Sequence, residues 1–241
     1  MTTLQALIFD VDGTLADTER DGHRIAFNLA FADAGLDWQW DETLYGELLA
    51  VTGGKERIRF FVDRHRPEFA ARDDFDALVK SLHAAKTAHY VRLVDSGALP
   101  LRPGVRRLID EARAAGLRLA IATTTTPENV EVLLRASMAP EAAAWFEVIG
   151  AGDIVPAKKP APDIYTWVLD RLGLPASACL AFEDSENGIR SSRAAGIPTL
   201  VTESEYTRGR DFAGALAVLP DLADTTLAEV RSIYRKGLSS A

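Results

Sequence analysis

The chain has 241 residues, of which 47% are hydrophobic, and it carries a formal net charge of −8 at pH 7. A chain of this length forms one large domain, or one domain with an insert. The acidic balance and the lack of a basic run argue against nucleic acid or an anionic membrane as the partner. No charged-then-apolar leader precedes Leu4, and no stretch approaches the roughly 20 apolar residues of a membrane span. The single cysteine, Cys179, cannot form an internal disulfide. We expect a cytoplasmic protein that is a monomer.

Short apolar runs alternate with helical patterns along most of the chain. The runs cover residues 4–9, 117–122, 147–149, 179–182 and 198–201. This alternation predicts the α/β class, with a doubly wound parallel sheet that has helices on both faces. In such sheets the functional site lies at the carboxyl ends of the strands, so the residues that follow each run are the ones to inspect.

The first apolar run ends in two carboxylates, Asp10 and Asp12. Gly13 breaks the strand directly after them, and Thr14 places a hydroxyl in the turn. Because unpaired buried charge is expensive, two acids at the end of a dry strand need a cation or a proton to hold them. The candidates are a divalent metal, a nucleophile with a general acid partner, or both. The alternative is a pair of turn acids that cap the next helix.

The interval from residue 15 to residue 103 contains only helical patterns. It is far too long for a connection between neighbouring strands, so we expect a helical insert with a core of its own. Because it leaves directly after the acidic strand, the insert would lie over the end of that strand as a lid. The predicted boundaries are residues 17–100 for a helical cap domain and residues 1–16 with 101–241 for the catalytic core.

Besides the two acids, hydroxyls and lysines that follow later strands are candidate site residues. Four threonines, residues 123–126, follow the second run, and their hydroxyls and the free amides of a helix start suit a phosphate oxygen, although a plain helix cap has the same pattern. Lys158 and Lys159 stand in a loop that is stiffened by prolines. A lysine held there would neutralise a phosphoryl group and a carboxylate together. Composition does not separate these two lysines.

The last candidate group is a second acidic strand end, Glu183-Asp184. Alone it would be an ordinary helix cap. Two acidic strand ends in one sheet, with a lysine and a hydroxyl nearby, predict a site of hard oxygen ligands for Mg²⁺.

These segments together resemble the four-motif pattern of the haloacid dehalogenase superfamily, and the insert resembles the cap of its β-phosphoglucomutase-like branch. The matching positions are residues 10–14, Thr123, Lys159 with its proline, and Glu183-Asp184. The resemblance implies a Rossmann-like core in which Asp10 is the nucleophile and Asp12 the general acid and base. It further implies that Thr123 and Lys159 bind the transferring phosphoryl group. The Mg²⁺ ligands would be Asp10, the Asp12 carbonyl, Glu183 and Asp184.

The insert is also similar to the CbbY-like xylulose-1,5-bisphosphate phosphatases, which are associated with rubisco and the Calvin cycle. The similar segments are residues 17–24, 44–49, 52–57 and 83–87. This resemblance implies that Glu19 and His23 bind sugar hydroxyls. It implies that a distant second phosphate is bound by Gly53, Gly54, Lys55, Arg57 and Lys86. The remaining implied substrate contacts are Tyr45, His83, Thr124 and Asn129. The alternative readings are a helix-to-helix turn at Gly53-Gly54, a solvated helix residue at His23 and core packing at Tyr45.

The resulting prediction is a Mg²⁺-dependent phosphatase that hydrolyses a small-molecule sugar phosphate, xylulose 1,5-bisphosphate, through an aspartyl phosphate. Two alternatives stay open, a β-phosphoglucomutase-like mutase and a broad sugar-monophosphate phosphatase. A dehalogenase is disfavoured because it needs neither Mg²⁺ nor an acid at position 12. A catalytically inactive phosphate-binding module would have lost a motif residue, and all of them are present.

Overall fold

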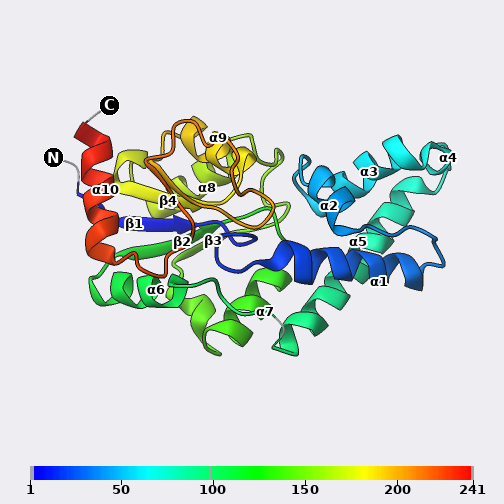
Figure 1. Cartoon of the computed structure of the whole chain (residues 1–241), viewed down its shortest axis with the longest axis horizontal. Coiled ribbons are helices and arrows are strands. Elements are labelled where there is room, and N and C mark those ends of the chain that lie inside the picture. Colours follow the sequence, from blue (N-terminus) through cyan, green and yellow to red (C-terminus); the bar gives the residue numbers. More distant parts are fainter. Residues whose placement is uncertain (1–2, 98, 240–241) are drawn as a thin grey trace.

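The computed structural model describes residues 3–97 and 99–239, and its centre is a six-stranded parallel sheet (Figure 1). The strand order is β3-β2-β1-β4-β5-β6, so the chain starts in the middle of the sheet and winds outward on both sides. This arrangement confirms the predicted doubly wound α/β class. The strands are β1 (Ala6–Phe9), β2 (Arg118–Ala122), β3 (Val148–Gly150), β4 (Cys179–Glu183), β5 (Thr199–Thr202) and β6 (Ala217–Leu219).

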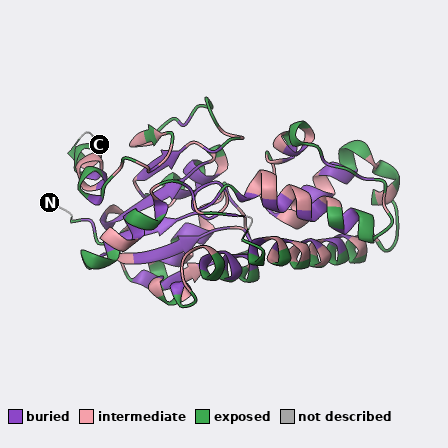
Figure 2. Cartoon of the chain, turned by 60° about the horizontal axis from the view of Figure 1, so that its bottom comes forward, coloured by how far each residue is buried: buried purple, intermediate pink, exposed green. Residues whose placement is uncertain are grey.

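Five helices cover the two faces of the sheet. One face packs against α6 (Val105–Ala114), α7 (Pro127–Ser137) and α10 (Leu227–Ser239), and the other against α8 (Asp163–Leu172) and α9 (Glu186–Ala194). Short 3₁₀ turns cover Ala142–Trp145 and Ala176–Ala178. α6 buries Val105, Leu108, Ile109 and Ala112 against the sheet, and α8 buries Ile164, Tyr165, Val168 and Leu172. The central strands are buried throughout, as Figure 2 shows in purple.

The five apolar runs match β1 to β5, with ends that shift by one or two residues. The sequence prediction missed β6. This strand has only three residues, lies at the edge of the sheet, and leaves Val218 45% exposed. A half-exposed edge strand lacks the continuous apolar run that marks a strand covered on both faces.

A helical segment follows β1 and precedes β2, at the right of Figure 1. We call it the insert. It consists of a π-helical turn, η1 (Glu19–Arg24), and the helices α1 (Ile25–Asp33), α2 (Glu42–Leu48), α3 (Gly54–His65), α4 (Pro67–Ala70) and α5 (Phe75–Asp95). Most of its buried side chains form an aromatic-rich cluster of their own, which we call the aromatic cluster, while Ala26, Tyr90 and Val94 pack with the core on the sheet. Trp38 and Trp40 belong to the aromatic cluster, where they pack edge-on against Phe31.

The two chain segments that join the insert to the sheet lie side by side. Ala16 forms an antiparallel bridge with Leu101, and the amide of Arg102 donates to the carbonyl of Leu15 at 2.9 Å. Further contacts join the insert to the loops at the strand ends. They include an ion pair between Lys55 and Asp153 and a hydrogen bond of 3.1 Å from Asn187 to Thr52. The insert is therefore held over the carboxyl ends of the strands.

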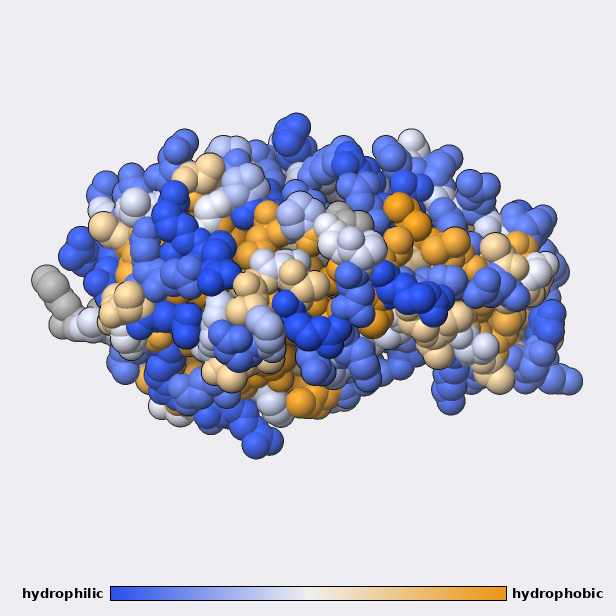
Figure 3. Space-filling model, turned by 90° about the horizontal axis from the view of Figure 1, so that it is seen from below, coloured by the Kyte–Doolittle hydropathy of each residue, from blue (hydrophilic) through white to orange (hydrophobic). Residues whose placement is uncertain are grey.

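The surface of the protein is mixed in character. Among the described residues, no helix combines the length and apolarity needed to cross a membrane. The face in Figure 3 is mostly hydrophilic, with apolar side chains interspersed rather than gathered on one element.

Candidate active site

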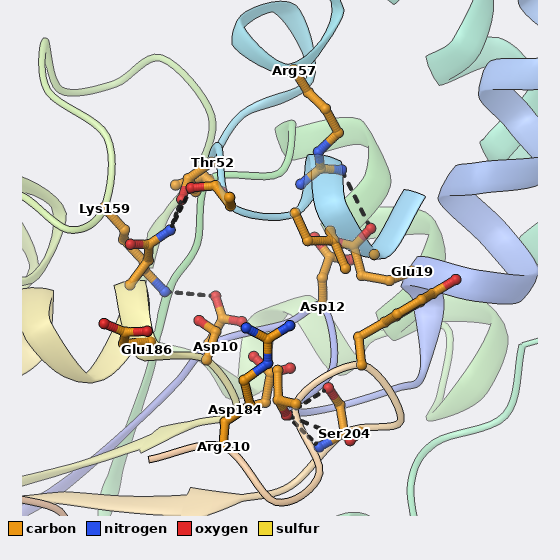
Figure 4. Close-up of a pocket in the computed structure, with 18 of the residues that line it drawn as sticks. Asp10, Asp12, Glu19, Thr52, Arg57, Lys159, Asp184, Glu186, Ser204 and Arg210 are labelled. Carbon is orange, nitrogen blue, oxygen red and sulfur yellow. Dashed lines mark hydrogen bonds and ion pairs between the residues drawn. The ribbon is translucent and has the colours of Figure 1, made fainter. Parts of the chain in front are cut away.

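The polar residues at the strand ends line a cavity of about 570 Å³ beneath the insert. Asp10 and Asp12 enter it after β1, Thr123 and Thr124 after β2, and Asp184 after β4. The insert contributes Glu19, Thr52, Arg57 and Arg64 to the same cavity. Figure 4 shows side chains from both parts of the chain directed into this space. The structure thus brings together groups that the sequence places more than a hundred residues apart.

Lys159 forms ion pairs with two acids at the cavity floor. Its Nζ lies 2.7 Å from Asp10 Oδ1 and 2.6 Å from Glu183 Oε1. Tyr165 donates a second hydrogen bond of 2.5 Å to the same Glu183 oxygen. Burial opposes the charge of Lys159, but the two carboxylates raise its pKa, so this lysine stays charged. The other lysine, Lys158, instead donates to Asp153 at 2.6 Å and does not line the cavity, so the structure separates the two lysines.

Asp10, Glu183 and Asp184 form a buried acidic triad. One oxygen from each lies within 4.8 Å of the others, and Glu183 Oε2 has no hydrogen-bond partner in the described structure. Burial raises the pKa of Asp10 to about 7, although Lys159 opposes the rise. Burial and the charges of Asp10 and Glu183 raise the pKa of Asp184 well above its usual value. One lysine for three buried acids leaves negative charge uncompensated, and hard oxygen ligands with an open position fit a divalent cation.

Asp12 is held by the insert and not by the triad. Its Oδ1 accepts from Thr18 Oγ1 at 2.5 Å and lies 2.8 Å from His23 Nε2. Burial works against ionisation, but the neighbouring His23 and the hydrogen bonds from His23 and Thr18 lower the pKa of Asp12 below its usual value. His23 Nδ1 in turn lies 2.8 Å from Lys86 Nζ, and the His23 ring stacks on Tyr90. Sequence analysis placed His23 and Lys86 at the substrate, whereas their contacts here form a chain that ends at Asp12.

The hydroxyl groups after β2 meet the cavity where α7 begins. Thr123 Oγ1 accepts from the amide of Thr125 at 3.3 Å, and α7 has Pro127 in its first turn. Asn129 is buried, and its side chain donates to Thr125 Oγ1 at 3.0 Å. Asn129 does not line the cavity, so its contact with Thr125 supports the loop that carries Thr123.

Glu19, Tyr45 and Arg57 form one network at the roof of the cavity. The Tyr45 hydroxyl donates to Glu19 Oε2 and accepts from Arg57 Nη1 at 2.7 Å. The guanidinium of Arg57 also lies over the Tyr45 ring, 5.1 Å from its centroid. Tyr45 is fully buried, whereas Glu19 and Arg57 reach the cavity. Tyr45 packs in the aromatic cluster, as the alternative reading expected, and its hydroxyl contacts two residues that line the cavity.

The glycine-lysine loop of the insert lies at a second cavity of about 210 Å³. Gly53, Gly54, Lys55 and His83 line it, and none of them lines the larger cavity. Hydrogen bonds from Lys158 and Lys55 lower the pKa of Asp153 to about 2, so the ion pair with Lys55 is fully formed at neutral pH. Burial lowers the pKa of His83 to about 4, which makes its imidazole neutral.

Several cavity residues were missed by the sequence analysis. Arg64 on α3 lies over the Phe60 ring, and Arg210 extends into the cavity from the loop between β5 and β6 (Figure 4). Neither guanidinium forms an ion pair with a residue that the structure describes. The same loop contributes Ser204, Tyr206 and Thr207. No motif marks this loop, and only its polar composition between two short apolar runs could have drawn attention to it.

Comparisons with known proteins give one consistent result. The family model for haloacid dehalogenase-like hydrolases matches residues 4–196. The chain is 54% identical over 221 residues to the plasmid-encoded protein CbbY of Cupriavidus necator, covering 92% of this chain and 87% of that protein. It is 30% identical over 195 residues to a phosphorylated carbohydrates phosphatase of Thermotoga maritima, covering 80% and 82%.

A solved structure extends this similarity to three dimensions. It is a crystal structure of a CbbY mutant from Rhodobacter sphaeroides in complex with xylulose-(1,5)bisphosphate. The TM-score is 0.87 at 46% identity, and the match covers 94% of this chain and 99% of that chain.

Proposed function

Because the chain belongs to the haloacid dehalogenase-like hydrolases and is a phosphatase, we propose that its substrate is a sugar bisphosphate, xylulose 1,5-bisphosphate, hydrolysed through a phosphorylated Asp10. The main support for this reaction is the buried ion pair between Lys159 and Asp10, together with the acidic triad to which Asp10 belongs. The complex formed by the CbbY mutant of Rhodobacter sphaeroides supports the choice of sugar. The insert, residues 17–100, would act as the cap domain over a core of residues 1–16 and 101–241.

The metal in this proposal is Mg²⁺. Asp10, Glu183 and Asp184 would hold it, together with the carbonyl of Asp12, because three carboxylates whose oxygens lie within 4.8 Å of one another fit such a cation. When bound, Mg²⁺ would supply positive charge that offsets the charge of the phosphoryl oxygens. Lys159, in the loop between β3 and α8, supplies a second positive charge, and Thr123 supplies a hydroxyl from the end of β2.

The proposed reaction has two displacements at phosphorus. In the first, a carboxylate oxygen of Asp10 forms a bond to phosphorus while the bond to the sugar oxygen breaks. The sugar oxygen takes a proton from Asp12. Asp12 is ionised in the present arrangement, so it must first gain that proton, and His23 Nε2 at 2.8 Å is placed to pass one to it. Lys86 Nζ, 2.8 Å from His23 Nδ1, is placed to return a proton to the imidazole. In the second, water attacks the same phosphorus, gives a proton to Asp12, and releases inorganic phosphate and free Asp10.

The second phosphate of the substrate would lie against Arg64 and Arg210. Both line the cavity and neither is neutralised by an acid of the described chain, whereas Arg57 already pairs with Glu19. A guanidinium binds two phosphate oxygens at once, so such a clamp contributes affinity and orientation. The loop that carries Lys55 is the second candidate for this role, although its charge is engaged by Asp153.

The test is a comparison of phosphate release from xylulose 1,5-bisphosphate and from the two matching monophosphates. The bisphosphate should exceed each monophosphate in kcat/KM by about 10²-fold or more, which is the cost of losing one charge-assisted clamp. Equal rates would point to a broad sugar-monophosphate phosphatase. An isomerised sugar phosphate without phosphate release would point to a mutase.

Substitution of Arg210 tests where the second phosphate binds. Arg210→Ala should remove the preference for the bisphosphate and leave slow hydrolysis of the monophosphate. Arg208→Ala is the matched control, because Arg208 is exposed on the same loop and does not line the cavity. If Lys55→Ala removes the preference and Arg210→Ala does not, the second phosphate lies at the glycine-lysine loop.

A further inference from the structure

Arg102 is a buried arginine that the proposed chemistry does not use. It lies in the segment that returns from the insert to the sheet, and its side chain is 6% exposed. Its guanidinium donates to the backbone carbonyls of Gly13, Thr202, Glu203 and Pro220, with distances of 3.3 Å to Thr202 and 3.1 Å to Pro220. These carbonyls follow the carboxyl ends of three different strands, β1, β5 and β6. One side chain therefore binds backbone at the ends of three strands.

Two of these loops enclose the carboxylate of Asp184. On one side is Gly13, where a Cβ atom would lie only 2.1 Å from Asp184 Oδ2. Ser204, on the other loop, lines the same cavity as Asp184, and its hydroxyl opposes the rise in the pKa of that carboxylate. Arg102 binds the carbonyl of Gly13 itself and the carbonyl of Glu203, the residue before Ser204. Arg102 therefore binds the backbone of both loops that adjoin Asp184.

We propose that Arg102 is a positioning residue for Asp184, which sets the geometry of the acidic triad by holding the Gly13 and Glu203 loops at a fixed separation. The inference rests on the proposed function, because it assigns Asp184 to a Mg²⁺ site. Lysine would not replace Arg102, since an ammonium on a flexible stem cannot bind carbonyls on two loops in one plane. Groups that orient a metal ligand without touching the metal change metal affinity about 10- to 100-fold when they are removed.

The molecule contains a matched control. Arg107, on α6, also donates to backbone carbonyls, those of Leu222, Ala223 and Thr225, at 2.8, 2.6 and 3.0 Å. Like Arg102 it binds several backbone carbonyls, but its side chain is 42% exposed and none of its partners belongs to the acidic triad. Arg107→Lys therefore shows what the loss of an arginine costs when that arginine has no link to the acidic triad.

The experiment is calorimetric titration of the full chain with Mg²⁺ alone, beside measurement of the urea unfolding midpoint. Arg102→Lys should weaken Mg²⁺ binding about 10-fold or more, whereas Arg107→Lys should leave it within about 2-fold. Added Mg²⁺ should restore kcat in Arg102→Lys, with the Mg²⁺ concentration for half-maximal activity raised by the same factor as the dissociation constant. Thr202→Val, which removes the hydroxyl that accepts from Arg102 at 3.0 Å, should weaken binding in the same direction by about 2- to 5-fold.

The outcomes separate the inference from the proposed function. A folded Arg102→Lys chain that binds Mg²⁺ as tightly as the unmodified chain overturns the role of Arg102. If Arg102→Lys does not fold, unchanged binding in Thr202→Val overturns it instead. If the unmodified chain itself does not bind Mg²⁺, the metal site of the proposed function is overturned, and the role of Arg102 with it.

Discussion

The Nζ atom of Lys86 lies 2.8 Å from Nδ1 of His23 in the buried interior of the insert. Burial lowers the pKa of Lys86 to about 8, so at neutral pH it is mostly charged and donates to Nδ1. The imidazole proton is then on Nε2, which faces Asp12 at 2.8 Å. Lys86 thereby selects the tautomer that hydrogen-bonds to the proposed acid and base.

We expect Lys86→Met to lower kcat by about 10- to 100-fold with little change in KM, because the tautomer and the orientation of His23 are lost but the cavity lining is not. Methionine keeps the packing against Phe27 and Tyr90. Lys80→Met on the same helix is the control, since Lys80 is exposed. Steady-state phosphate release measures both variants. Unchanged kcat in Lys86→Met would show that Asp12 works without this chain.

We expect Asp10→Asn to abolish phosphate release, because an amide cannot form the aspartyl phosphate. Asp12→Asn should lower kcat by about 10²- to 10⁴-fold, the usual contribution of a general acid. Rapid quenching and mass spectrometry should detect phosphorylated Asp10 in the Asp12→Asn chain. A folded Asp10→Asn chain that keeps a tenth of the activity would rule out the covalent route.

Removal of divalent cations should stop the reaction. Without a cation, the three acids of the triad repel one another and the substrate phosphate. Dialysis against a chelator should therefore remove activity and lower the melting temperature, and added Mg²⁺ should restore both. Full activity in excess chelator would contradict the metal assignment.

Gly13 and Gly35 give a matched pair of substitutions. Both have positive φ, 84° and 67°, so alanine at either position costs about 1–2 kcal/mol of backbone strain. Nothing lies within 4 Å of a Cβ at Gly35, whereas a Cβ at Gly13 would collide with Asp184 Oδ2. We expect Gly35→Ala to lower stability only, and Gly13→Ala to lower stability further and also weaken Mg²⁺ binding. Denaturant titration and calorimetry separate the two effects. Equal losses in both variants would show that the turn has room for a side chain.

Cys179 should be unreactive in the native chain. It is fully buried on β4, and burial raises the pKa of its thiol to about 11. Because the thiolate is the reactive form, iodoacetamide at pH 8 should label it only after unfolding. Rapid labelling of the folded protein would mean that β4 opens locally.

The site residues that could be predicted from the sequence are those that follow the carboxyl ends of the strands. Asp10 and Asp184 follow apolar runs directly, and the order of strands in a parallel sheet brings their ends together. The choice between Lys158 and Lys159 could not be made, because it depends on which side chain turns inward. Arg64 and Arg210 were missed because they come from a helix face and a loop whose positions are set by tertiary packing. His23 and Lys86 were found, but their direction toward Asp12 depends on how η1 packs against α5.

The place of the insert in the chain also determines when the sheet can assemble. Ala6 pairs with Arg118 on one side and with Cys179 on the other, so β1 gains neither neighbour until the chain has passed through the whole insert. The helices of the insert form contacts that are local by comparison. Because contacts between distant residues slow folding, we expect the aromatic cluster of the insert to become protected from hydrogen exchange before the strands do during refolding. The segment that covers Asp10 and Asp184 would then be in place before these two acids meet.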